Sequence, residues 1–120
     1  MSTVLIVDDD ATMTSLLTTL LQLDGYDVLQ ASSKDGMLRV LGEQRPDIVL
    51  MDVFIGEADG LKILADLKGS NDHRLDMPVI MTSGMNLMRE CEAAGASAFL
   101  MKPYDPDRLL SAIKKHLDGE

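Results

Sequence analysis

The chain has 120 residues, the size of one ordinary domain, and its 46% hydrophobic and 26% charged residues exclude the disordered class. Acidic residues outnumber basic ones by 20 to 11, giving a net charge of −9, and no basic stripe is present, so we expect no direct binding of nucleic acid. One cysteine allows no internal disulfide, and no signal peptide or long apolar segment is visible, so we expect a cytoplasmic domain over residues 1–120 without membrane insertion.

The chain begins with a predicted strand over residues 3–8. Its run Val4-Leu5-Ile6-Val7 is continuously apolar, which is typical of a strand buried on both faces, and it leads into Asp8-Asp9-Asp10. Apolar residues then recur at helical spacing over residues 11–23, where Asp24-Gly25 ends the helix. A short second strand is predicted over residues 27–31.

The middle of the chain repeats this alternation. Ser33 can cap a helix that extends to about residue 44. After Pro46, the run Ile48-Val49-Leu50-Met51-Asp52 predicts a third buried strand that again ends in an aspartate. The turn Asp59-Gly60 begins a third helix that ends near residue 69, and residues 70–77 are interpreted as a polar loop.

The last part of the chain predicts a strand over residues 79–83. Gly84 then leads to a helix that Ala94-Gly95 closes. A strand over residues 98–101 precedes Lys102, and a final helix covers 105–117, with Asp105 as N-cap and a proline at the first helical position. Most of the nine methionines, including Met85, Met88 and Met101, are assigned to the core.

Five strand–helix units predict an α/β fold, namely a five-stranded parallel sheet covered by helices on both faces. With right-handed crossovers, the doubly wound, flavodoxin-like arrangement has the strand order 2-1-3-4-5. This order follows from the fold class, and it makes the first and third strands neighbours.

Reactive side chains follow four of these strands at the carboxyl edge of the sheet, where such folds bind ligands. Asp8 and Asp9 would lie roughly 5 Å from Asp52 on the neighbouring strand, and crowded carboxylates of this kind require a cation to remain ionised. An oxygen-only site favours Mg²⁺. With Thr82-Ser83 and Lys102 at the same edge, the set suits phosphoryl transfer. The chain has no glycine-rich nucleotide-binding motif.

This pattern resembles the receiver domains of two-component response regulators, of the chemotaxis type, over the whole chain. The motifs that carry the resemblance are Asp8-Asp9, the run from Pro46 to Asp52, the run from Pro78 to Gly84, and Lys102-Pro103. The resemblance implies that Asp52 accepts a phosphoryl group from a phosphohistidine, and that it binds Mg²⁺ together with Asp8, Asp9 and the backbone carbonyl of Phe54. It also implies a switch hydroxyl on Ser83, with Thr82 as the fallback, an ion pair from Lys102, and a cis bond before Pro103.

The chain departs from the family pattern at two places. Ile55-Gly56 replaces a frequent Met-Pro after the acceptor, and the flexible glycine predicts weaker binding of the metal without phosphate. The switch position three residues before Lys102 is Phe99, an aromatic residue without a hydroxyl. Phe54 and Met85 hold positions that flank the path of hydrolytic water in this family. Because neither can hydrogen-bond water, we expect slow hydrolysis of the phosphorylated aspartate.

The sequence leaves two alternative functions. Residues 8–12 also fit the D-x-D-x-T signature of haloacid-dehalogenase-like phosphatases, with Asp8 as nucleophile and Asp10 as acid/base, although such enzymes need a longer chain with a later acidic pair. A pseudo-receiver interaction domain that is never phosphorylated is the other, and the intact Asp52 and Lys102 argue against it.

The resemblance implies a sensor histidine kinase or a histidine phosphotransfer protein as the phosphodonor, docking near the helix over residues 11–23. A downstream protein target or an output domain would respond to the phosphorylated form of the domain. The sequence leaves open whether the domain acts alone or comes from a longer regulator, and whether its phosphorylated form is a homodimer.

Overall fold

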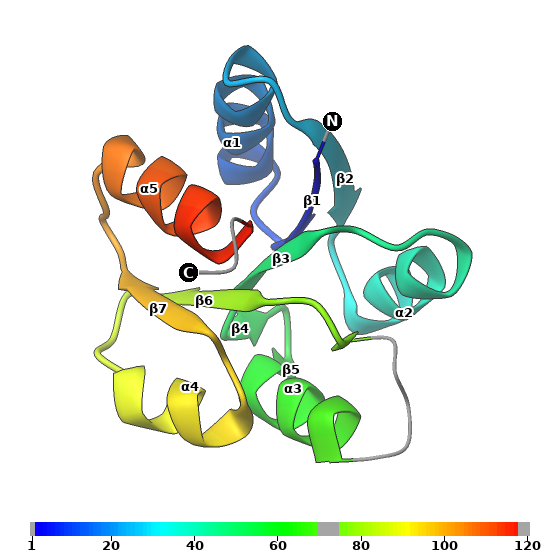
Figure 1. Ribbon diagram of the computed structural model, residues 1–120. Coiled ribbons are helices and arrows are strands. Elements are labelled where there is room, and N and C mark those ends of the chain that lie inside the picture. The colour runs from blue at the N-terminus through cyan, green and yellow to red at the C-terminus, as the bar shows by residue number, and fades with distance from the viewer. Residues whose placement is uncertain (1, 70–74, 118–120) are drawn as a thin grey trace.

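A parallel sheet forms the centre of the computed structural model, which describes residues 2–69 and 75–117. Its five strands are β1 (Thr3–Val7), β2 (Asp27–Ala31), β3 (Ile48–Asp52), β6 (Val79–Ser83) and β7 (Ala98–Met101). They are arranged in the order β2-β1-β3-β6-β7, so the predicted order and fold class are confirmed (Figure 1). Residues 1, 70–74 and 118–120 of the predicted domain, and with them part of the predicted polar loop, lie outside the described residues.

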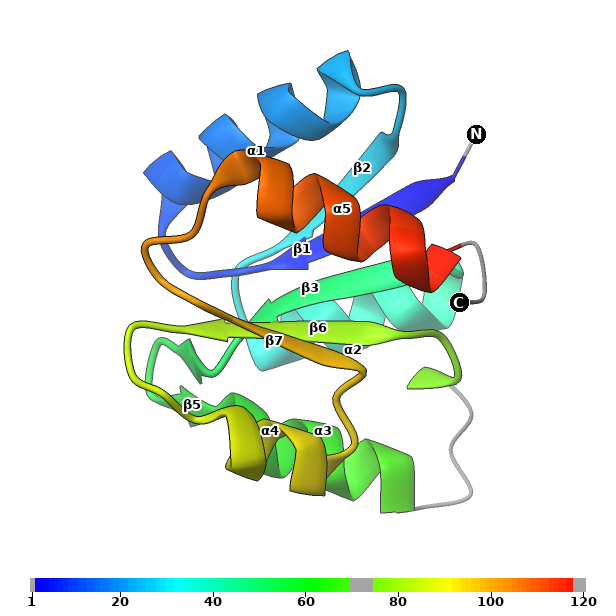
Figure 2. The same ribbon diagram turned by 60° about the vertical axis from the view of Figure 1, so that its left-hand side comes forward.

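Helices cover both faces of the sheet (Figures 1 and 2). Those on one face are α1 (Ala11–Leu23) and α5 (Pro106–Leu117); those on the other are α2 (Lys34–Glu43), α3 (Gly60–Gly69) and α4 (Met88–Ala94). Side chains of the central strands alternate between two clusters, so that Ile6 packs with α1 and α5 while Leu5 packs with α2, α3 and α4. No helix in the described ranges is long and apolar enough to cross a membrane.

Side-chain caps fix where the first two helices begin. The Asp10 carboxylate accepts from the backbone N–H groups of Thr12 (3.0 Å) and Met13 (3.1 Å) at the start of α1. Ser33 Oγ accepts from the N–H of Gly36 (3.0 Å) at the start of α2, as the sequence predicted. The 13 residues of α1, ATMTSLLTTLLQL, include no charged side chain.

Three sequence-based expectations differ from the structure. The helix expected after Gly84 begins only at Met88, although it ends at Ala94 with Gly95 as its C-cap, as predicted. Met85 precedes this short helix, Met88 begins it and Met101 ends β7; they are 59%, 48% and 51% exposed and do not belong to the core. The stretch before β6 is not uniformly polar, since Leu75 and Met77 are buried and their carbonyls accept hydrogen bonds from the Lys68 ammonium.

A small antiparallel hairpin was not predicted. Its strands, β4 (Phe54–Ile55) and β5 (Ala58–Asp59), pair directly after β3 and lead into α3. Gly56 in its turn has φ +59°, a left-handed conformation that glycine adopts without steric cost.

Candidate functional site

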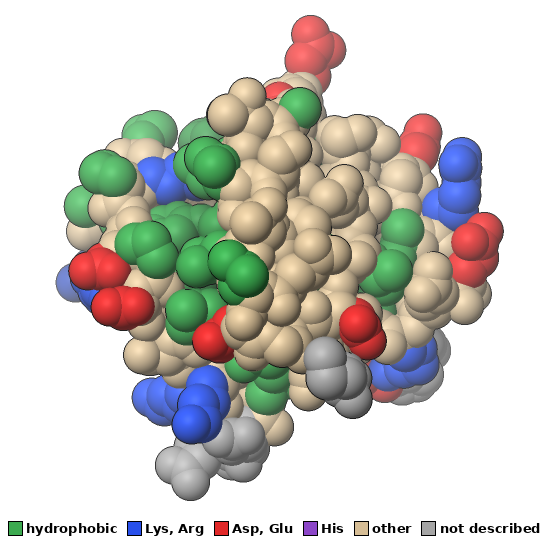
Figure 3. Space-filling view, turned by 90° about the horizontal axis from the view of Figure 1, so that it is seen from above, with side chains coloured by type: hydrophobic (Ala, Val, Ile, Leu, Met, Phe, Trp, Pro, Cys, Tyr) green, Lys and Arg blue, Asp and Glu red, His purple; other side chains and the backbone are tan. Residues whose placement is uncertain are grey.

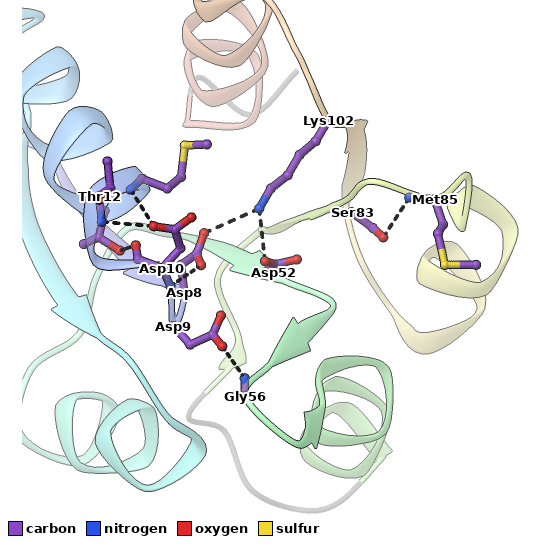
Figure 4. A network of polar contacts seen from close by, with 11 residues as sticks. Asp8, Asp9, Asp10, Thr12, Asp52, Gly56, Ser83, Met85 and Lys102 are labelled. Atoms are coloured by element: carbon purple, nitrogen blue, oxygen red, sulfur yellow. Dashed lines mark hydrogen bonds and ion pairs between the residues drawn. The ribbon is translucent and has the colours of Figure 1, made fainter.

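The carboxyl ends of β1 and β3 bring three aspartates together. These strands pair in parallel, with Val7 opposite Met51, so Asp8 and Asp52 come next to each other at the same edge of the sheet. One oxygen from each of Asp8, Asp9 and Asp52 lies within 4.8 Å of the others. Figure 4 shows their carboxylates facing a common space. The predicted spatial convergence of these residues is therefore present.

Lys102, from the end of β7, reaches into this group. Its Nζ lies 3.0 Å from Asp52 Oδ2 and 3.6 Å from Asp8 Oδ2 (Figure 4). The Lys102 backbone N–H donates to the carbonyl of Ser83 at 2.8 Å, which ties the residue to the end of β6. The peptide bond between Lys102 and Pro103 is cis.

The buried acid of the group is Asp8. Burial raises the pKa of its carboxyl group, and the nearby charges of Asp52 and Asp9 act in the same direction, although the hydrogen bond from the Asp10 N–H and the Lys102 charge partly oppose them. Burial alone would lower the pKa of the Lys102 ammonium, but the hydrogen bond to Asp52 and the neighbouring carboxylates outweigh it, so this pKa is raised. Lys102 is thus held as a cation beside a buried acid, Asp8, whose ionised form is disfavoured.

Asp9 is the exposed member of the trio and contacts the hairpin. Its Oδ2 accepts from the backbone N–H of Gly56 at 2.9 Å (Figure 4). Asp10, by contrast, uses its carboxylate to cap α1. An Asp10 engaged in this way is not positioned as the acid/base that a dehalogenase-like mechanism requires.

The hydroxyl candidates lie at the end of β6. Ser83 is 1% exposed, and its Oγ accepts from the backbone N–H of Met85 at 3.1 Å (Figure 4). Thr82 is also buried and stands opposite Asp52 in the β3–β6 pair. Because successive side chains of a strand point to opposite faces, the two hydroxyls point to different sides of the sheet.

The other candidate residues lie around this edge. Phe99 is partly buried and packs against the core cluster beneath α4. The Phe54 side chain is 52% exposed, and that of Met85 is 59% exposed. Phe54 begins β4, and its backbone carbonyl follows Asp52 by two residues in the sequence.

Gly60 is a site residue that sequence reasoning missed. Its N–H donates to the Val53 carbonyl at 2.6 Å, and a Cβ placed on it would lie 2.7 Å from the carbonyl oxygens of both Asp52 and Val53. The Asp59-Gly60 pair was interpreted as a turn, which gave no sign of this close approach to the backbone of Asp52.

A groove of about 530 Å³ opens beside the acidic group, between α1 and the segment that links β7 to α5. Its walls are mostly apolar, and Lys102 is its charged lining residue; the lining residues are Met13, Leu16, Leu17, Leu20, Lys102, Pro103, Tyr104 and Pro106. Figure 3 shows hydrophobic side chains gathered beside α1.

The family model described as the response regulator receiver domain matches residues 4–114. The chain belongs to the response regulator receiver domain family. Members of this family are phosphoacceptors of two-component signalling and take phosphoryl groups from histidine kinases or phosphotransfer proteins.

Two curated relatives illustrate the range of proteins that contain such a domain. The receiver domain is 31% identical over 114 residues to sporulation initiation phosphotransferase F of Bacillus subtilis, covering 95% of this chain and 92% of that protein. It is 35% identical over 117 residues to the transcriptional regulatory protein GlrR of Escherichia coli, covering 95% of this chain and only 26% of that protein.

A solved structure of a receiver domain has a similar fold. The response regulator receiver domain protein (CheY-like) from Methanospirillum hungatei superposes with a TM-score of 0.87 at 29% identity, covering 99% of this chain and 95% of that one.

The acidic group of this receiver domain fits the Mg²⁺ that the family binds. Three carboxylate oxygens within 4.8 Å, with no sulfur or imidazole among them, form the hard donor set that Mg²⁺ prefers.

Proposed function

We propose that Asp52 accepts the phosphoryl group from a phosphohistidine on a partner protein. An oxygen of the Asp52 carboxylate attacks phosphorus, the phosphorus–nitrogen bond breaks, and the released imidazole takes a proton. The ion pair of 3.0 Å between Lys102 and Asp52, formed within the acidic group, supports this assignment most directly. Such transfer depends mainly on positioning and on neutralising charge.

The neighbouring residues have distinct roles in this proposal. Asp8, Asp9, Asp52 and the Phe54 carbonyl hold Mg²⁺, which offsets charge on the phosphoryl oxygens when it is bound. Lys102 pairs with another phosphoryl oxygen once it leaves the Asp52 carboxylate. The domain thereby promotes its own phosphorylation, and it hydrolyses the acyl phosphate slowly.

Signalling follows from movement of the switch residues. Ser83, or Thr82 in its place, donates to a phosphoryl oxygen, and Phe99 moves inward as the β6–α4 segment shifts. The altered face formed by α4, β7 and α5 then binds a downstream protein target, an output domain, or a second copy of the domain. This is a two-state element biased by a local change in charge.

The acceptor is tested by intact-mass measurement after incubation with acetyl phosphate and Mg²⁺. We expect one phosphoryl adduct on the wild-type domain, none without Mg²⁺ and none on Asp52→Ala. Reductive trapping with borohydride followed by peptide mapping should mark residue 52. A mark on Asp8 would instead establish the dehalogenase-like function, and no adduct at all would favour the pseudo-receiver.

We also propose that the groove beside α1 receives the partner that carries the phosphohistidine. Lys102 is one of its lining residues, and the uncharged α1 offers the apolar side chains that a partner helix would cover. Leu16, 63% exposed, lines the groove, whereas Leu23, 83% exposed, lies at the far end of the same helix.

Leu16→Asp should therefore slow phosphotransfer from a phosphorylated histidine phosphotransfer protein by about tenfold or more, since a charge placed in an apolar interface costs at least ~1.4 kcal/mol. Phosphorylation by acetyl phosphate should be unchanged, because no protein partner is then involved. Leu23→Asp is the matched control and should leave both rates unaltered. Equal slowing by the two variants, or slowing with acetyl phosphate, would remove the support for this docking site.

Phe54 and Met85 are proposed to lengthen the lifetime of phosphorylated Asp52. Their exposed side chains flank the acceptor and cannot orient a water molecule for attack. Phe54→Asn should shorten the half-life of the phosphorylated domain on the order of tenfold, equivalent to ~1.4 kcal/mol of barrier, under matched Mg²⁺. The decay of the intact-mass adduct measures this, with Met88→Asn as a control outside the site. A longer half-life in Phe54→Asn would contradict the proposal.

A further inference from the structure

Two segments that lie far apart in the sequence are joined by a hydrogen bond at the edge of the site. The Gly56 N–H in the β4–β5 turn donates to Asp9 Oδ2 in the β1–α1 loop at 2.9 Å, although the residues are 47 positions apart (Figure 4). The neighbouring acids are held differently, Asp8 by the Asp10 N–H at 2.9 Å and Asp52 by Lys102 at 3.0 Å.

This hydrogen bond restrains the side chain of Asp9. Asp9 is exposed, so its side chain would otherwise sample several rotamers, and binding a cation would have to immobilise it. A backbone N–H fixed in a hairpin holds one carboxylate oxygen and leaves the other oxygen free to act as a ligand. Hydrogen bonds to a charged carboxylate are stronger than those between neutral groups.

Glycine is suited to this task at position 56 for two reasons. Its φ of +59° lies in the left-handed region, which side chains with a Cβ enter only at a cost. Its amide also carries the hydrogen that a proline would lack. No atom lies within 4 Å of a Cβ built on Gly56, so strain of the backbone, and not crowding, is what a substitution there would add.

We propose that the Gly56 amide is a positioning group for the metal site: it holds Asp9 in a ligand-ready orientation before any cation binds, and so strengthens the binding of Mg²⁺ without phosphate. This is the opposite of the weaker binding that the flexible glycine predicted from sequence. The inference rests on the proposed role of Asp9 as a ligand.

The direct test replaces the Gly56 amide with an ester by protein semisynthesis, which exchanges the N–H for oxygen and keeps the backbone geometry. We expect the dissociation constant for Mg²⁺, measured by isothermal titration without a phosphodonor, to rise about five- to tenfold. Gly56→Asn keeps the N–H and tolerates a positive φ, so its affinity should stay within about twofold of wild type. An ester with unchanged affinity, or a Gly56→Asn variant as weak as the ester, would overturn the proposal.

Two further measurements separate this inference from the proposed function. Asp9→Ala should weaken Mg²⁺ binding more than the ester does. If it does not weaken binding at all, the assignment of Asp9 as a ligand fails; if it does and the ester does not, only the role of Gly56 fails. Hydrogen exchange by NMR should find the Gly56 amide protected in the metal-free domain, and exchange at the rate of a free amide would also overturn the proposal.

Discussion

Gly60→Ala is expected to destabilise the domain by about 3 kcal/mol, because its Cβ would overlap backbone that cannot move aside. The added atom would lie 2.7 Å from the carbonyl oxygens of Asp52 and Val53, where no flexible side chain can yield. The gain in helix propensity at the first residue of α3, at most about 1 kcal/mol, does not offset this clash. Urea denaturation without metal measures the loss.

The clash also predicts a functional loss, because relief requires the chain around Asp52 to shift. Mg²⁺ affinity should fall together with stability. Gly42→Ala is the matched control, since Gly42 lies within α2 and has nothing within 4 Å of a Cβ. It should raise stability by about 0.5–1 kcal/mol and leave Mg²⁺ binding unchanged. Equal stabilities of the two variants would show that the contact at Gly60 is relieved at little cost.

The second large effect concerns the charge balance at the site in the absence of metal. Lys102→Met leaves the carboxylates of Asp8 and Asp52 without the ammonium that lies 3.6 Å and 3.0 Å away. We expect the free energy of unfolding to fall by about 2 kcal/mol. Asp8→Asn should raise the free energy of unfolding, because it removes the carboxylate whose pKa is raised by burial. Saturating Mg²⁺ should restore most of the stability of Lys102→Met. Lys115→Met, on the exposed side of α5, is the control and should change little.

The pH dependence of the metal-free protein follows from the same pKa. Because the folded pKa of Asp8 lies above its ordinary value of 3.8, the unfolded chain loses this proton first as pH rises. The contribution of Asp8 to stability is therefore fully present below pH 3.8 and is lost as pH rises through the folded pKa. The groups that face Asp8 are Asp9, Asp52, Lys102 and Tyr104.

Comparing urea denaturation of Asp8→Asn with wild type between about pH 4 and pH 8 isolates this contribution. The stability advantage of Asp8→Asn should grow with pH over this range. An advantage that shrinks towards neutral pH would mean that Asp8 is stabilised as an anion without metal, and the charge argument would be wrong.

The sheet and the acidic group were predictable because strands buried on both faces appear in the sequence as continuous apolar runs. The runs ending at Val7 and Met51 are continuously apolar, so the aspartates that follow had to emerge at one edge of the sheet. Helix caps were equally predictable, since a capping side chain such as Ser33 accepts a hydrogen bond from an N–H group only a few residues away.

Other features depend on contacts that no local pattern encodes. Strands of two residues, such as Phe54–Ile55, have no periodicity, so the hairpin was invisible, and with it the bond from Gly56 to Asp9. Residues 84–87 carry no apolar spacing that separates a turn from a first helical turn. The exposure of Met85 follows from where α4 begins, and tertiary packing decides that position.

The lack of charge on α1 has a thermodynamic consequence for any protein that covers it. Few counterions would be released or rearranged there, so the association constant should respond only slightly to ionic strength. Removing Leu16 and its apolar neighbours from water should instead produce a negative change in heat capacity. Recognition at this helix would then vary with temperature, while the acidic edge beside it, with its clustered carboxylates, would retain the sensitivity to dissolved ions.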